Sequence, residues 1–136
     1  MGDIRTTITP ATGISAGDQW GVPVVGLVGE VDMACEDPVR TALAGQLDRR
    51  TAGLVLDLTE VDFFGSTGVR LLVEACGRAE QQGTTIAVAT TRRSVLRTLE
   101  MTRVDQLVDI RPTVPDALAA LRCAGVPPPR RTASHR

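Results

Sequence analysis

The stretch GLVLDLTEVDFFGSTGVRLLVEAC, at residues 53–76, contains the change from strand to helix that decides the fold. Its first part, residues 53–59, is rich in Leu and Val and is typical of a strand buried on both faces. In its later part the apolar residues from Val69 to Cys76 recur at spacings of three and four, which predicts a helix over residues 66–81. Ser66 and Thr67 therefore stand where a strand ends and a helix begins.

The same two patterns recur along the rest of the chain. β-Branched runs predict further strands, and apolar residues spaced by three or four predict further helices. Thr91 is predicted to cap the third helix and Thr113 the fourth. The segment after Pro10, rich in Gly, Ala and Ser, is predicted to be a loop. The other predicted strands cover residues 4–9, 22–29, 84–90 and 106–110, and the other predicted helices cover residues 36–49 and the segments that follow Thr91 and Thr113.

This alternation of strands and helices predicts an α/β fold. Right-handed crossovers between the strands give a mostly parallel sheet of about five strands with about four helices. The 136 residues suit a single folded domain over residues 1–124, and the sequence VPPPRRTASHR predicts a disordered basic tail over residues 125–136. In such sheets binding sites gather at the carboxyl ends of the strands, where Asp32 and Ser66 are both predicted to lie.

Composition excludes several classes of partner. An apolar fraction of 43% with 23% charged residues is ordinary for a soluble protein, and we expect a cytoplasmic location. The formal net charge of -1 provides no overall field that would attract nucleic acid or a membrane. The most apolar run, residues 22–28, is too short to span a membrane and contains Pro23 and Gly26.

The residues needed for a metal site or a catalytic serine are scarce. Cys35, Cys76 and Cys123 are widely spaced among apolar residues, which favours reduced thiols in the core. The only histidine, His135, lies in the predicted tail, and the chain has no lysine. Ser66 therefore has no evident base, and we expect neither an enzyme nor a cofactor or metal.

Two roles are open to Ser66. At the start of a helix its hydroxyl can cap an unpaired backbone amide, the commonest role of serine there. Alternatively, it can accept a phosphoryl group, because the negative charge would stand at the positive end of the helix. The pleat of the preceding strand predicts that one of Phe63 and Phe64 faces the core and the other a partner. We expect Phe64 to be the partner contact.

The quoted turn, the segment GEVD at residues 29–32 and the later RRSVLRTLEMTRVDQLVDI together resemble the STAS domain of bacterial anti-sigma factor antagonists. The similarity runs from about residue 4 to residue 121. In that family the antagonist binds an anti-sigma factor that is also a serine kinase, which frees the sigma factor. Phosphorylation of a serine in this turn breaks the complex, and a serine phosphatase restores it.

Carried over by position, the resemblance implies that Ser66 is the phosphoacceptor. It also implies a partner-binding surface and transcription regulation by partner switching, without direct contact to nucleic acid or a membrane. The family turn usually reads Asp-Ser-Ser/Thr-Gly, whereas Gly65 stands here in place of the aspartate. A second hypothesis therefore stays open, in which the domain is a non-phosphorylated scaffold or an accessory subunit of a signalling assembly or transporter. The implied partner-binding residues are Asp32, Phe64, Gly65, Thr67 and Gly68.

Overall fold

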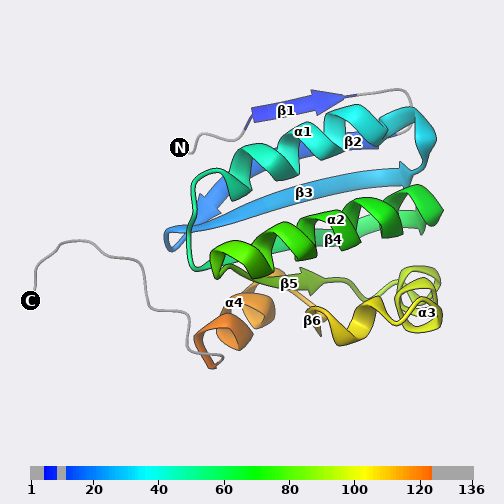
Figure 1. The fold of residues 1–136 in the computed structure, drawn as a ribbon. Helices are drawn as coiled ribbons and strands as arrows, with labels where there is room; N and C mark the ends of the chain where they lie inside the picture. Colours follow the sequence, from blue (N-terminus) through cyan, green and yellow to red (C-terminus); the bar gives the residue numbers. More distant parts are fainter. Residues whose placement is uncertain (1–4, 9–11, 124–136) are drawn as a thin grey trace, which may run out of the picture.

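The computed structural model describes residues 5–8 and 12–123, which form one six-stranded sheet and four α-helices (Figure 1). Neighbouring strands follow the order of the sequence, so the sheet order is β1-β2-β3-β4-β5-β6. The first three strands pair antiparallel, and β3 to β6 pair parallel. The strands are β1 (Arg5–Ile8), β2 (Thr12–Gln19), β3 (Val22–Val31), β4 (Gly53–Phe64), β5 (Thr85–Ala89) and β6 (Asp109–Arg111).

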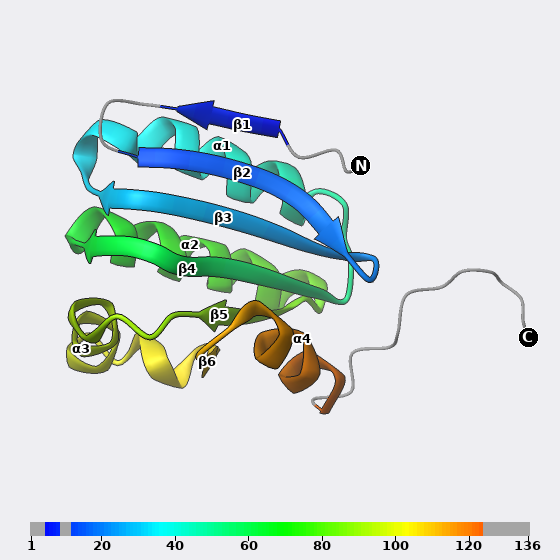
Figure 2. The same cartoon turned by 180° about the vertical axis from the view of Figure 1, so that it is seen from behind.

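The helices cover the two faces of the sheet unequally. On one face α1, α2 and α3 bury the larger apolar core. There α1 and α2 lie side by side, α1 over β2 and β3 and α2 over β4 and β5 (Figure 1). On the other face α4 packs against β4, β5 and β6 over a smaller core (Figure 2). The helices are α1 (Glu36–Leu47), α2 (Ser66–Gln82), α3 (Arg93–Met101) and α4 (Val114–Cys123).

The predicted α/β class and the mostly parallel sheet are confirmed, but one strand was not predicted. The segment after Pro10, interpreted as a loop, contains β2. It pairs with β3 along its whole length through the backbone, and a tight turn at Trp20 and Gly21, with φ of 55° and 77°, connects them. Backbone hydrogen bonds to β3 hold this strand in place. Its side chains are mostly small and show no strand pattern, so the sequence does not reveal it.

The ends of two elements also differ from the prediction, and the cap of a third is confirmed. The last strand is β6 (Asp109–Arg111) rather than residues 106–110, because residues 104–106 form a short 3₁₀ turn, η2. The cap residue of α3 is Arg92 and not Thr91. The Oγ1 of Thr113 accepts from the amide of Asp116 at 3.1 Å, which confirms the cap of α4.

The cysteine prediction holds only in part. Cys35 is buried, Cys76 is half-buried and Cys123 is exposed, and all three are free thiols. Burial raises the pKa of Cys76 to about 11, so this thiol stays protonated near neutral pH. The predicted tail, residues 125–136, lies outside the described residues. In the ranges that are described, no helix is long and apolar enough to cross a membrane.

Candidate functional site

Ser66 is the first residue of α2, at the carboxyl end of β4, and its side chain is exposed. The prediction that Ser66 caps the helix is wrong. The amide of Val69 donates to the carbonyl of Gly65 at 3.1 Å, so the helix begins one residue earlier than a cap at Ser66 would require. Gly65 is the cap residue, and no side chain of the described residues caps this end. The Ser66 hydroxyl is therefore presented to solvent rather than used by the fold.

Gly65 matters because there is little room for a side chain at this position, and not because of its backbone conformation. Its φ of -87° and ψ of -165° are extended values that any residue adopts. A Cβ at this position would lie 2.7 Å from Cε2 and 3.0 Å from Cζ of Phe63. The ring of Phe63 therefore lies across Gly65, in the space that a side chain there would need.

The two phenylalanines face opposite sides, as the pleat predicts, but the predicted assignment is reversed. Phe64 is only 2% exposed and belongs to the core, whereas Phe63 is 50% exposed. Phe64 cannot be a direct partner contact in this structure, because β4 continues to Phe64 and its pleat directs that ring inward. Phe63 is the aromatic residue at the surface, which sequence reasoning could have identified only by fixing the strand register.

Thr67 and Gly68 are also buried, so they support the turn from beneath. Thr67 is 4% exposed. A Cβ on Gly68 would lie 2.8 to 2.9 Å from three ring carbons of Phe64, so the glycine lets the Phe64 ring pack against the helix. These two residues and Phe64 therefore shape the site without forming its surface.

Asp32 lies beside the turn, as its position at a strand end predicts. The amide of Gly65 donates to the carbonyl of Val31 at 3.2 Å, which places the end of β3 next to the start of α2. The Asp32 carboxylate is half-buried and accepts from the amide of Ala34 at 3.0 Å, capping the short 3₁₀ turn η1 (Met33–Cys35). Met33, the next residue, is 77% exposed. The site thus presents one hydroxyl with apolar side chains nearby.

Charged residues join α1 to α2 behind this turn, and the sequence reasoning missed them. Arg70 Nη1 donates to Glu36 Oε2 at 2.9 Å, and Arg40 Nε donates to Glu74 Oε1 at 3.1 Å. Hydrogen bonds from Arg70 and then Arg40 hold the pKa of Glu36 below its usual value. The signal was available in part, because Arg70, Glu74 and Arg78 recur every four positions in α2 and Glu36 and Arg40 are four apart in α1. We call the set Glu36, Arg40, Asp48, Arg70, Glu74 and Arg78 the interhelix charge row.

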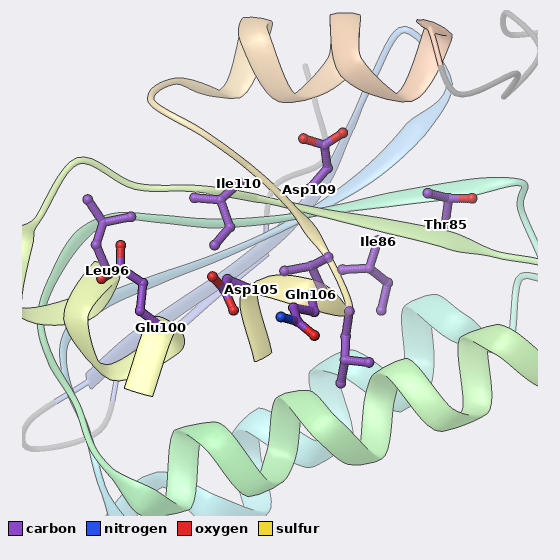
Figure 3. Close-up of a pocket in the computed structure, with 10 residues that line it drawn as sticks. Thr85, Ile86, Leu96, Glu100, Asp105, Gln106, Asp109 and Ile110 are labelled. Carbon is purple, nitrogen blue, oxygen red and sulfur yellow. The ribbon is translucent and has the colours of Figure 1, made fainter. Parts of the chain in front are cut away.

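A separate hollow of about 570 Å³ lies between β5, α3, η2 and β6 (Figure 3). Ile86 and Ile110 provide apolar lining, and Glu100, Asp105 and Asp109 provide carboxylates. Residues 61–68, all within the described part of the chain, contribute nothing to it. The described residues also contain no group of three or more side chains that could hold a metal ion. The Ser66 turn is the candidate site at the carboxyl ends of the strands, apart from this hollow.

A sequence model of the STAS domain matches residues 14–117, which include the sheet from β3 to β6 and all four helices in whole or in part. The chain belongs to the STAS domain family. Two similar proteins are anti-sigma factor antagonists. The anti-sigma-F factor antagonist RsfB of Mycobacterium tuberculosis is 27% identical over 80% of this chain and 88% of its own length. A crystal structure of an anti-sigma factor antagonist from Mycobacterium paratuberculosis is 27% identical, with a TM-score of 0.77 over 85% of this chain and 99% of that one.

The STAS fold also occurs in proteins of another class. A murine Solute Carrier 26 family member A9 anion transporter contains a region with a TM-score of 0.67 and 18% identity, which covers 78% of this chain but 18% of the transporter. At that identity the likeness is one of fold alone. The STAS domain family and the likeness to anti-sigma factor antagonists were both predicted from the turn and its flanking segments.

Proposed function

We propose that this STAS domain is an anti-sigma factor antagonist that binds an anti-sigma factor serine kinase, releases the sigma factor, and is switched off by phosphorylation of Ser66. The observation that carries the proposal is the exposed Ser66 hydroxyl at the uncapped start of α2. The similarity to anti-sigma factor antagonists over most of the chain supports the class of partner.

The start of α2 is suited to receive a phosphoryl group. Backbone amides at a helix start carry roughly half a positive charge, and a phosphoserine carries roughly -1.5 to -2 charges. The described residues supply neither a side-chain cap nor an acidic residue in the first turn of α2. The modified domain therefore keeps its fold, and the change is confined to its surface.

Phosphorylation of Ser66 weakens binding because the partner covers apolar side chains near the turn. Phe63 lies across Gly65, next to Ser66, and Met33 follows the neighbouring strand end. A partner that covers these side chains must remove water from Ser66 as well. A phosphate there would cost desolvation, and a difference of a few kcal/mol releases most of the complex. In this account Asp32 and Gly65 lie at the partner surface, and Phe64, Thr67 and Gly68 support it.

The switch works together with other proteins of the cell. A serine phosphatase restores the binding form. The protein acts in the cytoplasm as a regulator and not as an enzyme, and it needs neither nucleic acid nor a membrane. The kinase consumes ATP, while the antagonist itself supplies only the acceptor hydroxyl.

Binding to the kinase tests the proposal. We expect Ser66→Ala to bind in the presence of ATP without being released, and Ser66→Asp to bind weakly. Thr85→Asp is the matched control, because it places the same charge at an exposed threonine at the opposite end of the parallel strands. It should bind as the parent does. Equal binding by the parent and both Ser66 variants would refute the switch.

Gly65 supports a second candidate, a scaffold that is not phosphorylated. The usual aspartate of the family turn is missing, and Phe63 occupies the space where it would stand. Incubation with a bound kinase and ATP, followed by mass measurement of the Ser66 peptide, separates the two. A phosphate-sized gain supports the switch, and an unchanged mass supports the scaffold.

A further inference from the structure

Ser66 is the first position of the row of α2 residues that faces α1. Residues four apart lie on one side of a helix, and Ser66, Arg70, Glu74 and Arg78 follow one another at that spacing. The three charged members each bond to α1 or to the residue that follows it: Arg70 to Glu36, Glu74 to Arg40, and Arg78 to Asp48. Ser66 thus continues the interhelix charge row toward the carboxyl ends of the strands, with a hydroxyl where the next charge would stand.

Arg70 is the residue of this row that a charge on Ser66 would reach first. Side chains in a helix lean toward its amino end, so the Arg70 side chain leans toward Ser66, one turn away. A negative group four residues before a positive one is the favourable order for such a pair. About half of the Arg70 side chain is exposed, so its guanidinium can change partner without being pulled out of a core.

Arg70 can leave its present partner, Glu36, at a small cost in stability. Arg70 donates to the two Glu36 oxygens at 2.9 and 3.4 Å. Glu36 also accepts from Arg40 Nη2 at 3.1 Å, so it keeps one cation if Arg70 leaves. Exposed ion pairs of this kind contribute little to stability. A phosphate carries more charge than a carboxylate and offers more acceptor oxygens, which favours the exchange.

We propose that Arg70 binds the phosphate of phosphorylated Ser66 and leaves Glu36 to do so. This inference rests on the proposed function, because it concerns the modified form of Ser66. The exchange breaks the contact between α1 and α2 nearest to the partner surface. The bonds of Glu74 to Arg40 and of Arg78 to Asp48 hold the rest of the two helices together. Phosphorylation therefore alters the start of α1, close to Asp32 and Met33, as well as Ser66 itself.

The direct test measures the second pKa of phosphoserine placed at position 66 during translation, which needs no kinase. Phosphorus NMR follows its titration near pH 6. The pKa should be lower in the parent than in Arg70→Gln, by roughly 0.2 to 0.7 pH unit for an exposed pair. Any effect of Asp32 on the phosphate is the same in both proteins, so the difference isolates Arg70. Arg78→Gln is the matched control, because Arg78 makes the same kind of ion pair, with Asp48, three turns away from Ser66. The phosphate in this variant should titrate as in the parent.

A double-mutant cycle tests the second half of the inference. The coupling between Glu36→Gln and Arg70→Gln, measured by unfolding, should be present with serine at position 66 and lost with phosphoserine. An equal phosphate pKa in the parent and Arg70→Gln, or a coupling that survives phosphorylation, would overturn the inference. Failure of the proposed function shows itself differently: the kinase would bind the serine and phosphoserine forms equally, whatever Arg70 does.

Discussion

The two ends of α2 differ in how they are bonded to the rest of the domain. Side-chain hydrogen bonds hold the carboxyl end, whereas no side chain of the described residues caps the amino end, which we call the open end. At the carboxyl end Gly83 adopts a φ of 77° and ends the helix, a conformation that glycine adopts without strain. Gln82 Nε2 donates to the carbonyl of Leu47 at 2.7 Å, and Thr84 Oγ1 donates to the carbonyl of Thr51 at 2.7 Å. Polar groups at this end are used by the fold.

At the amino end the equivalent groups remain available. Gly65 gives no side-chain cap, Ser66 is exposed, and the Phe63 ring lies on the glycine instead of in the core. Groups that the fold does not use can be used by a partner or an enzyme that acts on the protein. The contrast between the two ends supports the proposal that the open end is the functional one, and four comparisons test it.

The largest effect is expected behind the open end, at Gly68. In Gly68→Val the new side chain meets the buried Phe64 ring, since even a Cβ would lie 2.8 Å from it. Overpacking of this kind costs about 1–3 kcal/mol, and we expect the upper part of that range. Denaturant unfolding measures it. Gly77→Val is the control on the same helix, where a Cβ meets no atom of the described residues within 4 Å. Similar losses in both variants would contradict the packing of Phe64 on Gly68.

The next effect compares the two ends directly. Thr84→Val keeps the shape of a buried side chain but removes the donor to Thr51 and the acceptor for Gln82. The free energy of unfolding should fall by about 1–3 kcal/mol. Ser66→Ala, at the open end, should change it by less than about 0.5 kcal/mol. If Ser66→Ala is as destabilising as Thr84→Val, the Ser66 hydroxyl is a structural group after all.

A smaller effect concerns Gly65 and Phe63. Gly65→Asp restores a capping carboxylate, which adds a few tenths of a kcal/mol, but it displaces the Phe63 ring. That ring is half-exposed and can turn away, so the net change in stability should be close to zero. In a Phe63→Ala background the displacement is absent and the gain from the cap should appear. An identical effect of Gly65→Asp in both backgrounds would show that the two positions are independent.

The smallest effect is the pH dependence that Glu36 contributes. Because its pKa is lower in the folded protein than the usual 4.5, its charge stabilises the fold above pH 4.5. That contribution is lost as the pH falls below 4.5 and through the lowered pKa. The difference in melting temperature between the parent and Glu36→Gln should therefore shrink on acidification across this range. A difference that stays constant from neutral pH to pH 3 would refute the role assigned to the arginines.

The sequence predicted the elements whose signal lies in their own side chains. Apolar runs identified β3 and β4, and spacings of three and four identified α1 and α2. It missed β2, where the pairing is through the backbone, and it reversed Phe63 and Phe64, because the strand was predicted to end at Thr59 and gave no register for them. The prediction that Asp32 and Ser66 lie close together, at two neighbouring strand ends, was correct. The meeting of Phe63 with Gly65 depends on a ring orientation that no local pattern encodes.

We propose above that Ser66 is the switch by which a kinase partner is released. It is tested most directly with an anti-sigma factor kinase that binds the unmodified protein. After incubation with ATP, peptide mass measurement should find phosphate on Ser66 and not on the buried Thr67, and the phosphorylated protein should no longer bind the kinase. An unmodified Ser66 peptide under these conditions, or a phosphorylated protein that binds as tightly as before, would contradict the account.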